Sequence, residues 1–311
     1  MSNQNFSRRR FLGAGALAIA GLTIASKSTL AKAVFAPVKP NSKFNGVQIG
    51  VITYSFRSMP GSIEQILKYC VDCNINAIEL MGDAAEAFAG APKREGTPAE
   101  HMTNMAQWRE NTLLDPFENI RKMFDNAGVS IYAWKPNALG EKNTDGEIEY
   151  AFKVGKVLGC SHVTVELSTD ALQTQRLGDL AEKHNIMVGY HAHTQATPTL
   201  WDTALAQSEY NGINLDIGHY TSGTSTNPVD FIVKNHKRIL SMHLKDRKFH
   251  DGPNQPWGKG DTPIKEVLQL IKKNGYKFPA TIELEYDIPA GSDAVKEVLV
   301  CREYAKNALM G

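Results

Sequence analysis

Three features of the sequence predict an α/β fold in which eight parallel strands alternate with helices, a (β/α)8 or TIM barrel. First, eight short apolar runs alternate with amphipathic stretches across residues 46–311, a length typical of this barrel. Second, the runs are rich in Val, Ile and Leu, as expected of parallel strands covered on both faces. Third, no run is followed by a Gly-rich phosphate-binding turn, which disfavours the alternative of a doubly wound open sheet.

The expected strands follow from these apolar runs, taken in chain order: 47–56, 77–82, 129–136, 162–168, 187–195, 212–220, 238–247 and 280–287. The expected helices are amphipathic, and several end on Gly or Asn, which are common helix C-caps: 62–74, 116–128, 147–159, 171–185, 199–210, 228–236, 264–276 and 293–309. A longer polar insert occupies 83–114. Since the loops that follow barrel strands build the site, this insert is a candidate lid.

The N-terminus predicts a targeting signal. A basic stretch, Arg8–Leu12, precedes a short uncharged apolar segment and then Ala31–Ala33, a small-x-small cleavage pattern. Paired arginines followed by Phe-Leu resemble a twin-arginine export signal. We therefore expect residues 1–33 to be a signal peptide cleaved near Ala33, residues 34–45 to be a linker, and 46–311 to be a single barrel domain. An uncleaved membrane anchor is the alternative.

The expected location is the periplasm or outside the cell, reached after folding through the twin-arginine export machinery. The rest of the chain has no apolar run of the roughly 18 residues that a membrane helix needs, so no stable span is expected after cleavage. The net charge of +1 provides no basic surface for nucleic acid. The four cysteines include Cys70 and Cys73 in one predicted helix, where buried structural roles are expected because no second pair lies at zinc spacing.

Polar side chains collect at the carboxyl ends of the predicted strands, where barrel enzymes place their chemistry. They are Glu79, Lys135, Glu166, His191, His193, Asp216, His219, His243 and Glu283. A single histidine at such a position is usually only hydrogen-bonded. Here each of the last four strands ends on a residue that can ligate a metal. Two histidines and two carboxylates would suit one divalent ion, either Mn²⁺, Zn²⁺, Fe²⁺ or Co²⁺.

The segments NLDIGH, MHLKDR, GKGDTPIKEVLQLIKKNGY and IELEY occur in this order and resemble the sugar phosphate isomerase/epimerase family of xylose isomerase-like barrels. The resemblance covers roughly residues 46–305. It implies one divalent metal held by side chains of strands five to eight, with Asp216, His243 and Glu283 as three ligands. His191 is the matching strand-five ligand, with His193 as the alternative, and His219 would face the substrate or support the ligands.

The sequence departs from the keto-sugar epimerases of that family at strand five. Those enzymes place there a glutamate that doubles as an acid/base, whereas this chain has His191. Proton transfer next to a carbonyl requires an acid and a base that flank the reacting carbon. Glu283 supplies one carboxylate, and the second must come from Glu166 or Glu79, or be replaced by a histidine. The predicted catalytic residues are therefore Glu283, Glu166 and His219.

Five side chains are predicted to contact the substrate: Lys135, His193, Lys245, Trp257 and Glu79. Trp257 lies in a loop, residues 249–261, whose Pro and Gly content suits a segment that closes over a sugar. Ordinary loop packing is the alternative for Trp257. Lys245 and Asp246 together could instead serve only to order this loop, and Lys135 could form an ion pair across the barrel mouth.

These observations predict a metal-dependent enzyme of the sugar isomerase/epimerase type, which abstracts a proton next to a carbonyl through a metal-bound enediolate. A lyase, hydratase or hydrolase acting on 3-keto-glycosides by the same chemistry is the first alternative. A non-catalytic sugar-binding barrel is the second. Endonuclease IV-like DNA repair, which shares the fold, is disfavoured by the near-neutral charge and the missing extra metal ligands. A homo-oligomer is compatible with the sequence, but no interface is identified.

Overall fold

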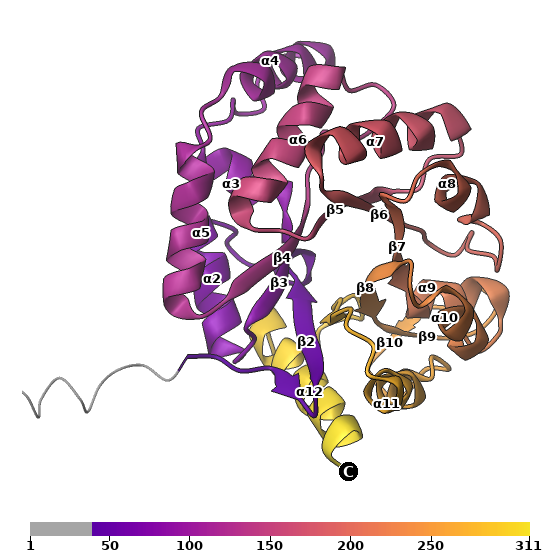
Figure 1. The fold of residues 1–311 in the computed structure, drawn as a ribbon. Coiled ribbons are helices and arrows are strands. Elements are labelled where there is room, and N and C mark those ends of the chain that lie inside the picture. The colour runs from indigo at the N-terminus through magenta and orange to yellow at the C-terminus, as the bar shows by residue number, and fades with distance from the viewer. Residues whose placement is uncertain (1–38) are drawn as a thin grey trace, which may run out of the picture. The chain divides into compact units, whose positions relative to one another are not determined.

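The computed structural model describes residues 39–311, which form one compact unit, Lys39–Gly311 (Figure 1). The predicted signal peptide, 1–33, and the first part of the predicted linker, 34–38, lie outside the described residues. Within residues 39–311, no helix combines the length and apolar character needed to cross a membrane.

Eight parallel strands close into a barrel, which confirms the predicted fold class. In barrel order they are β2 (Val47–Ile52), β3 (Ala77–Met81), β4 (Ser130–Lys135), β5 (His162–Glu166), β6 (Met187–His191), β7 (Asn211–Asp216), β8 (Ile239–Leu244) and β11 (Ala280–Ile282). Strand β2 pairs in parallel with both β3 and β11, so the sheet has no open edge along this ring. The open-sheet alternative is thereby excluded.

Helices surround this barrel in Figure 1. They are α2 (Ile63–Asp72), α5 (Asp115–Ala127), α6 (Asp145–Leu158), α7 (Ala171–His184), α8 (Asp202–Gln207), α9 (Ile217–Thr224), α10 (Val229–Asn235), α11 (Ile264–Asn274) and α12 (Ala294–Met310). The insert adds α3 (Gly82–Phe88) and α4 (Pro98–Asn111). Three short strands, β1 (Lys43–Phe44), β9 (Asp246–Arg247) and β10 (Asn254–Gln255), and one 3-10 turn, η1 (Thr53–Phe56), complete the unit.

The helix ends follow local sequence chemistry. Ser62, Thr97 and Thr144 begin α2, α4 and α6, and each forms a reciprocal capping box with the Glu or Gln three residues later. Gly128 and Gly159 end α5 and α6 with φ of 79° and 83°, a backbone conformation that glycine adopts without steric cost. These capping residues determine where the helices begin and end.

The core has an apolar layer between the strands and the helices, and inside it lie the buried thiols of Cys70, Cys73 and Cys301. Burial raises the pKa of Cys73 to about 12, so this thiol stays protonated and unreactive at neutral pH. This placement agrees with the structural role expected for the Cys70–Cys73 pair.

Several strands end earlier than predicted, and this changes where the site residues lie. The strand predicted over 212–220 ends at Asp216, because the Asp216 carboxylate accepts a hydrogen bond from the His219 backbone N–H at 2.7 Å and caps α9. The strand predicted over 187–195 ends at His191. His219 is therefore in the first turn of a helix, and His193 is in a loop.

Candidate metal centre

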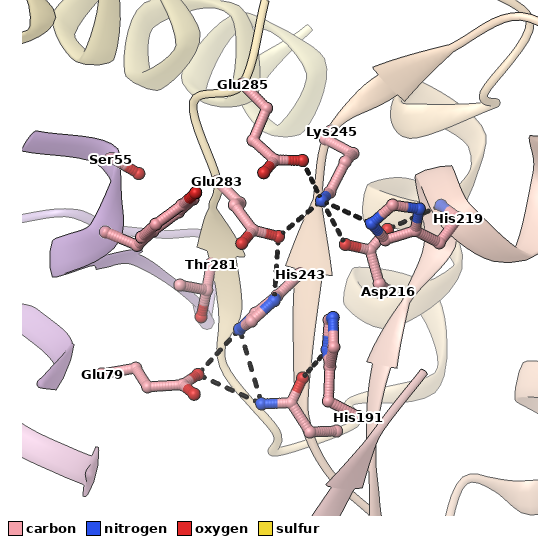
Figure 2. Close-up of polar contacts among 12 residues, drawn as sticks. Ser55, Glu79, His191, Asp216, His219, His243, Lys245, Thr281, Glu283 and Glu285 are labelled. Atoms are coloured by element: carbon pink, nitrogen blue, oxygen red, sulfur yellow. Dashed lines mark hydrogen bonds and ion pairs between the residues drawn. The ribbon is translucent and has the colours of Figure 1, made fainter. Parts of the chain in front are cut away.

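The four predicted metal ligands converge at the carboxyl end of the barrel. His191 and Asp216 are the last residues of β6 and β7, His243 lies in β8 opposite Asp216, and Glu283 directly follows β11. Each offers one ligand atom, and these atoms all lie within 4.8 Å of one another. All four side chains are buried, and Figure 2 shows how they converge. The prediction that four consecutive strands build one cluster therefore holds in space.

The ammonium group of Lys245 lies among the carboxylates of this cluster. Its Nζ atom is 3.0 Å from Asp216 Oδ2, 2.8 Å from Glu283 Oε2 and 2.5 Å from Glu285 Oε2 (Figure 2). The side chain is 3% exposed. Burial opposes the charged form, but Asp216, Glu283 and Glu285 outweigh it and raise the pKa of Lys245. A cation is thus already held by the oxygen atoms that a divalent ion would use.

The donor chemistry fits a divalent transition metal. Asp216 Oδ2 is buried, and its one charged neighbour among the described residues is the Lys245 ammonium at 3.0 Å, so this oxygen faces a position that a cation occupies. His191 Nδ1 lies 3.2 Å from the Asn214 side-chain oxygen, so a proton on Nδ1 leaves Nε2 as the ligating nitrogen. Burial lowers the pKa of His191 well below its usual value, so its ring is neutral. Two nitrogen and two oxygen ligands suit the metals predicted from the sequence.

The charges within the cluster are strongly coupled. Burial alone would lower the pKa of His243, but the carboxylates of Glu79 and Glu283 raise it to about 10. Burial raises the pKa of Asp216 to about 7, against the opposing effect of Lys245. Burial also disfavours ionised Glu283, yet Lys245 and His243 hold its pKa well below the usual value. The chain's own cations, Lys245 and His243, thus compensate the buried carboxylates, since unpaired buried carboxylates are costly.

Glu79 was predicted to contact substrate, but its side chain has no exposed surface. Its carboxylate accepts hydrogen bonds from Thr164 Oγ1 at 2.6 Å and from Asn214 Nδ2 at 3.1 Å, and it lies 2.8 Å from His243 Nε2. Burial would raise the pKa of Glu79, but His243 lowers it to about 2. The geometry assigns Glu79 to orienting His243 from inside the barrel.

His219 lies between two cations. Its Nε2 is 3.0 Å from Lys245 Nζ, and its Nδ1 is 2.7 Å from Arg247 Nη1. Burial and Lys245 lower the pKa of His219 to about 2, so the ring is neutral and only one nitrogen can accept a hydrogen bond. His191, His193 and His219 also come close enough to share an ion. That group lacks a carboxylate and borders two cations, so the four-residue cluster is the better metal site.

The D-x-G-H pattern has a steric cause. A Cβ atom on Gly218 would lie 2.6 Å from the Lys245 backbone oxygen and 2.4 Å from its Cγ. Only glycine therefore allows α9 to start close enough to β8 for His219 to reach Lys245. This contact explains why the Gly that precedes His219 belongs to the site.

Lys135, Glu166 and His193 lie together at the mouth of the barrel. Lys135 Nζ is 2.6 Å from Glu166 Oε1, and His193 Nε2 is 3.7 Å from Glu166 Oε2. The His193 ring lies 5.1 Å from the ring of His191, between centroids. The side chains of Glu166 and His193 are about half exposed, unlike the four ligands. Burial disfavours ionised Glu166, but the Lys135 ammonium lowers its pKa, so the carboxylate is ionised.

The loop after β8 is held by Asp246 and not by Lys245. The Asp246 carboxylate accepts hydrogen bonds from the backbone N–H groups of Gly258, Lys259, Gly260 and Thr262, at 2.7–3.2 Å. Trp257 is 8% exposed and its ring packs edge-on against Tyr304 of α12, with centroids 5.7 Å apart. The loop-packing alternative therefore describes Trp257 and Asp246, whereas Lys245 belongs to the metal centre.

Sequence reasoning missed the polar layer beneath the ligands. Asn214 donates to Glu79 and to Ser241 Oγ, both at 3.1 Å, and His162 Nε2 lies 2.9 Å from Ser241 Oγ. Strand alternation could have found part of this layer. Asn214 precedes Asp216 by two positions and Ser241 precedes His243 by two, so each pair shares a strand face. Two further residues were not identified as site residues: Glu285, which contacts Lys245, and Arg247, which contacts His219.

Comparison with known proteins identifies related chains. The family model described as xylose isomerase-like TIM barrel matches residues 67–304. An uncharacterized protein of Methanocaldococcus jannaschii is 32% identical over 96 residues, which cover 30% of this chain and 31% of that protein.

Two similar solved structures show the same fold at low identity. A probable 3-DHS dehydratase, AsbF, from Bacillus anthracis has a TM-score of 0.61 and 15% identity, covering 83% of this chain and 98% of that one. A sugar phosphate isomerase/epimerase from Parabacteroides distasonis has a TM-score of 0.61 and 17% identity, covering 83% and 95%.

The family model spans most of the barrel, including every residue of the four-ligand cluster. The closed ring of strands and the placement of that cluster at its carboxyl end agree with this match. The chain belongs to the xylose isomerase-like TIM barrel family.

Proposed function

We propose that this protein is a divalent-metal-dependent carbohydrate enzyme of the sugar isomerase/epimerase type, which moves a proton at a carbon next to a carbonyl. The observation that carries the proposal is the buried cluster of His191, Asp216, His243 and Glu283 at the barrel mouth. When bound, Mn²⁺, Zn²⁺, Fe²⁺ or Co²⁺ would act as a Lewis acid that stabilises negative charge developing on a substrate oxygen.

The protein supplies the proton transfer. Glu166 is the candidate base, because it is ionised, half-exposed at the mouth and held by Lys135 at 2.6 Å. Glu283 is the second carboxylate at the reacting carbon. Neutral His219, with Lys245 3.0 Å from its Nε2, would hold the lysine ammonium in position beside the substrate. Lys135 and His193, beside Glu166, would orient the sugar.

A lyase, hydratase or hydrolase acting on 3-keto-glycosides is the second candidate, because it begins with the same proton abstraction. Two observations favour keeping it. The strand-five position that is Glu in keto-sugar epimerases is His191 here, and a cavity extends beyond the Lys135–Glu166 pair. One of the similar solved structures is also that of a probable dehydratase. A non-catalytic sugar-binding barrel would need neither metal nor proton transfer.

The test combines metal analysis with isotope exchange. We expect the wild-type protein to hold about one transition-metal ion per chain and to exchange the hydrogen next to the carbonyl of a keto-sugar with solvent deuterium. His243→Ala should lose both properties. His236→Ala is the matched control, because His236 is only partly buried and stacks on Tyr276 away from the cluster. A folded wild type that binds none of these ions after dialysis would overturn the proposal and favour the binding barrel.

A further inference from the structure

A large cavity adjoins the metal centre. Its volume is about 870 Å³, within the range of roughly 300–1,000 Å³ seen for sites of drug-sized ligands. One wall is α4 of the insert, and the other walls are the connections that follow β4 and β5. The lining includes Met102, Ala106, Leu139, Lys142, Asn143 and Ser168. Among the described residues that line it, none belongs to the four-ligand cluster, so this volume is additional to the metal centre.

The cavity and the metal centre share a border. Lys135 and Glu166 both line the cavity, and they form the 2.6 Å ion pair at the barrel mouth. On its other side, Glu166 Oε2 lies 3.7 Å from His193 Nε2, and the His193 ring lies 5.1 Å from the ring of the ligand His191. A molecule seated on the metal centre can therefore extend past Glu166 into the cavity.

The wall formed by α4 is fixed. Arg109 of α4 is 6% exposed and lies 2.9 Å from Glu86 Oε1 and 2.9 Å from Glu147 Oε1. It also donates to the Asn137 backbone oxygen at 3.0 Å. These contacts join α4 to α3, to α6 and to the connection after β4. The insert therefore forms one wall of the cavity, and this wall is preorganised for binding in the absence of ligand.

The lining chemistry suits an uncharged ring. Met102 is 52% exposed although it is apolar, and with Ala106 of the same helix it offers a surface for the face of a ring. Asn143 and Ser168 offer hydrogen bonds to its edge. Arg109 is paired with Glu86 and Glu147, and Lys135 is paired with Glu166. Lys142 has no ion pair among the described residues, and the cavity lining also holds the carboxylates of Asp83 and Glu141. This balance disfavours a phosphate group.

We propose that the substrate is a glycoside, with one sugar ring at the metal centre and a second, uncharged ring group in the cavity beside α4. This inference rests on the proposed function and specifies its substrate class. A second sugar and an aromatic aglycone share the required chemistry, an apolar face with a hydrogen-bonding edge.

The test measures solvent deuterium exchange next to the carbonyl for three substrates, using the full metal-loaded protein. These are 3-keto-glucose, a 3-keto-disaccharide and the 3-keto form of 4-nitrophenyl glucoside. We expect kcat/KM for at least one glycoside to exceed that for 3-keto-glucose by about tenfold or more. The better of the two glycosides then identifies the second ring as a sugar or an aromatic group.

The cavity is blocked by Met102→Trp, which should reduce this ratio to about one. Gln107→Trp places the same ring on an exposed position of α4 outside the lining and should keep the wild-type ratio. Lys142→Trp blocks the cavity from the opposite wall and replaces Met102→Trp if that variant does not fold. Equal kcat/KM values in the wild type, or a ratio that survives both blocking variants, would overturn the inference and leave the proposed function intact.

If no substrate exchanges deuterium, the proposed function fails, and the cavity is then tested by calorimetry with unoxidised 4-nitrophenyl glucoside. Binding by the wild type and by Gln107→Trp, with a loss of about tenfold or more in affinity in Met102→Trp, would support the cavity as a glycoside site. Absence of binding to the wild type would overturn this inference as well.

Discussion

The buried carboxylate of Glu79 determines which nitrogen of His243 is available to a metal. His243 Nε2 is directed at Glu79, at 2.8 Å, and Nδ1 lies toward Glu283, at 3.1 Å. With its Nε2 proton donated to Glu79, the ring presents Nδ1 to the cluster. A carboxylate behind a ligating histidine fixes its tautomer and increases its basicity.

Glu79→Gln should therefore weaken metal binding by about 10–100-fold, because the amide keeps the shape of the side chain but removes its negative charge. The measurement is competition with a chelating dye, and the visible spectrum of the Co²⁺ form should shift. Glu297→Gln is the matched control, since Glu297 is also buried but binds Tyr286 and Ser292. Metal affinity that is the same in Glu79→Gln and wild type would contradict this role.

At the scale of single residues, the sequence could identify the four residues of the cluster but not the side chains that contact them. His191, Asp216, His243 and Glu283 each end an apolar run, so position alone brings them together. Lys245 and Asp246 are adjacent and equally polar, yet one enters the metal centre and the other holds the loop at Gly258–Thr262. Whether each of these two side chains points into the barrel or toward the loop depends on the local course of the backbone. Because β8 ends at Leu244, the inward–outward alternation of strand side chains does not predict the direction of either one.

Among the elements, α4 is attached through Arg109 as well as through the packing of Trp108 against Tyr150 of α6. This guanidinium donates to Glu86 through Nε and Nη2, at 2.9 and 3.1 Å, and to Glu147 through Nη1, at 2.9 Å. Removing one partner of such a group leaves buried charges uncompensated, which is far more costly than losing an exposed pair. Loss of the Arg109 ion pairs should therefore destabilise the insert, because Arg109 is the residue of α4 that forms them.

Arg109→Met should lower the free energy of unfolding by about 3–5 kcal/mol and should increase backbone hydrogen exchange within Pro98–Asn111. Arg121→Met is the control, because its pair with Asp125 is at 3.5 Å with both side chains about half exposed, and it should cost less than about 1 kcal/mol. Denaturant titration and hydrogen-exchange mass spectrometry are the measurements. An Arg109→Met protein with wild-type stability and exchange would show that α4 is held by other contacts.

The insert also shows what could be predicted about elements. Its existence and its place on the site side of the barrel followed from the length of the polar segment 83–114. Its helical content did not, although Thr97, Pro98 and Glu100 form a helix-start signature that the structure uses. The sequence also did not predict that β7 ends at Asp216. This residue is both the last residue of the strand and the N-cap of α9, and the capping role was not recognised.

For the whole molecule, the pH dependence of stability should reflect His162 inside the barrel. Its ring is buried between Ser161 Oγ and Ser241 Oγ, each at 2.9 Å, and burial lowers its pKa from 6.5 to about 4. The unfolded chain, with a histidine pKa of about 6.5, takes up this proton first as the pH falls. Stability from this residue is therefore present above pH 6.5 and lost between about pH 6.5 and 4.

The metal-free wild type should lose about 3 kcal/mol more than His162→Gln when the pH falls from 7.5 to 4. Glutamine can keep a hydrogen bond to Ser241 but does not titrate, so the comparison removes the contributions of other groups. Denaturant titrations at several pH values provide the measurement. Parallel stability curves for the two proteins would show that His162 does not control this dependence.

The closed barrel itself was the most predictable feature, because eight apolar runs of similar length leave few other arrangements. Closure depends on β2 pairing with both β3 and β11, and any α/β sequence of this periodicity and length favours it. The polar layer of Glu79, Asn214, Ser241 and His162 was harder to foresee. Asn214 and Ser241 are register partners on the adjacent strands β7 and β8, but Glu79 comes from β3 and His162 from β5. All four become neighbours only when the ring closes.

Lys245 gives the barrel a counter-ion that is part of the chain. A soluble ion can be diluted away or removed by a chelator, whereas this ammonium is tethered beside Asp216 and Glu283. The fold can therefore form in surroundings poor in metal, with its inner carboxylates already compensated. If a divalent metal binds as proposed, it would exchange with the lysine as the partner of Asp216 and Glu283, and the ammonium would keep Glu285, 2.5 Å from its Nζ, as its counter-ion.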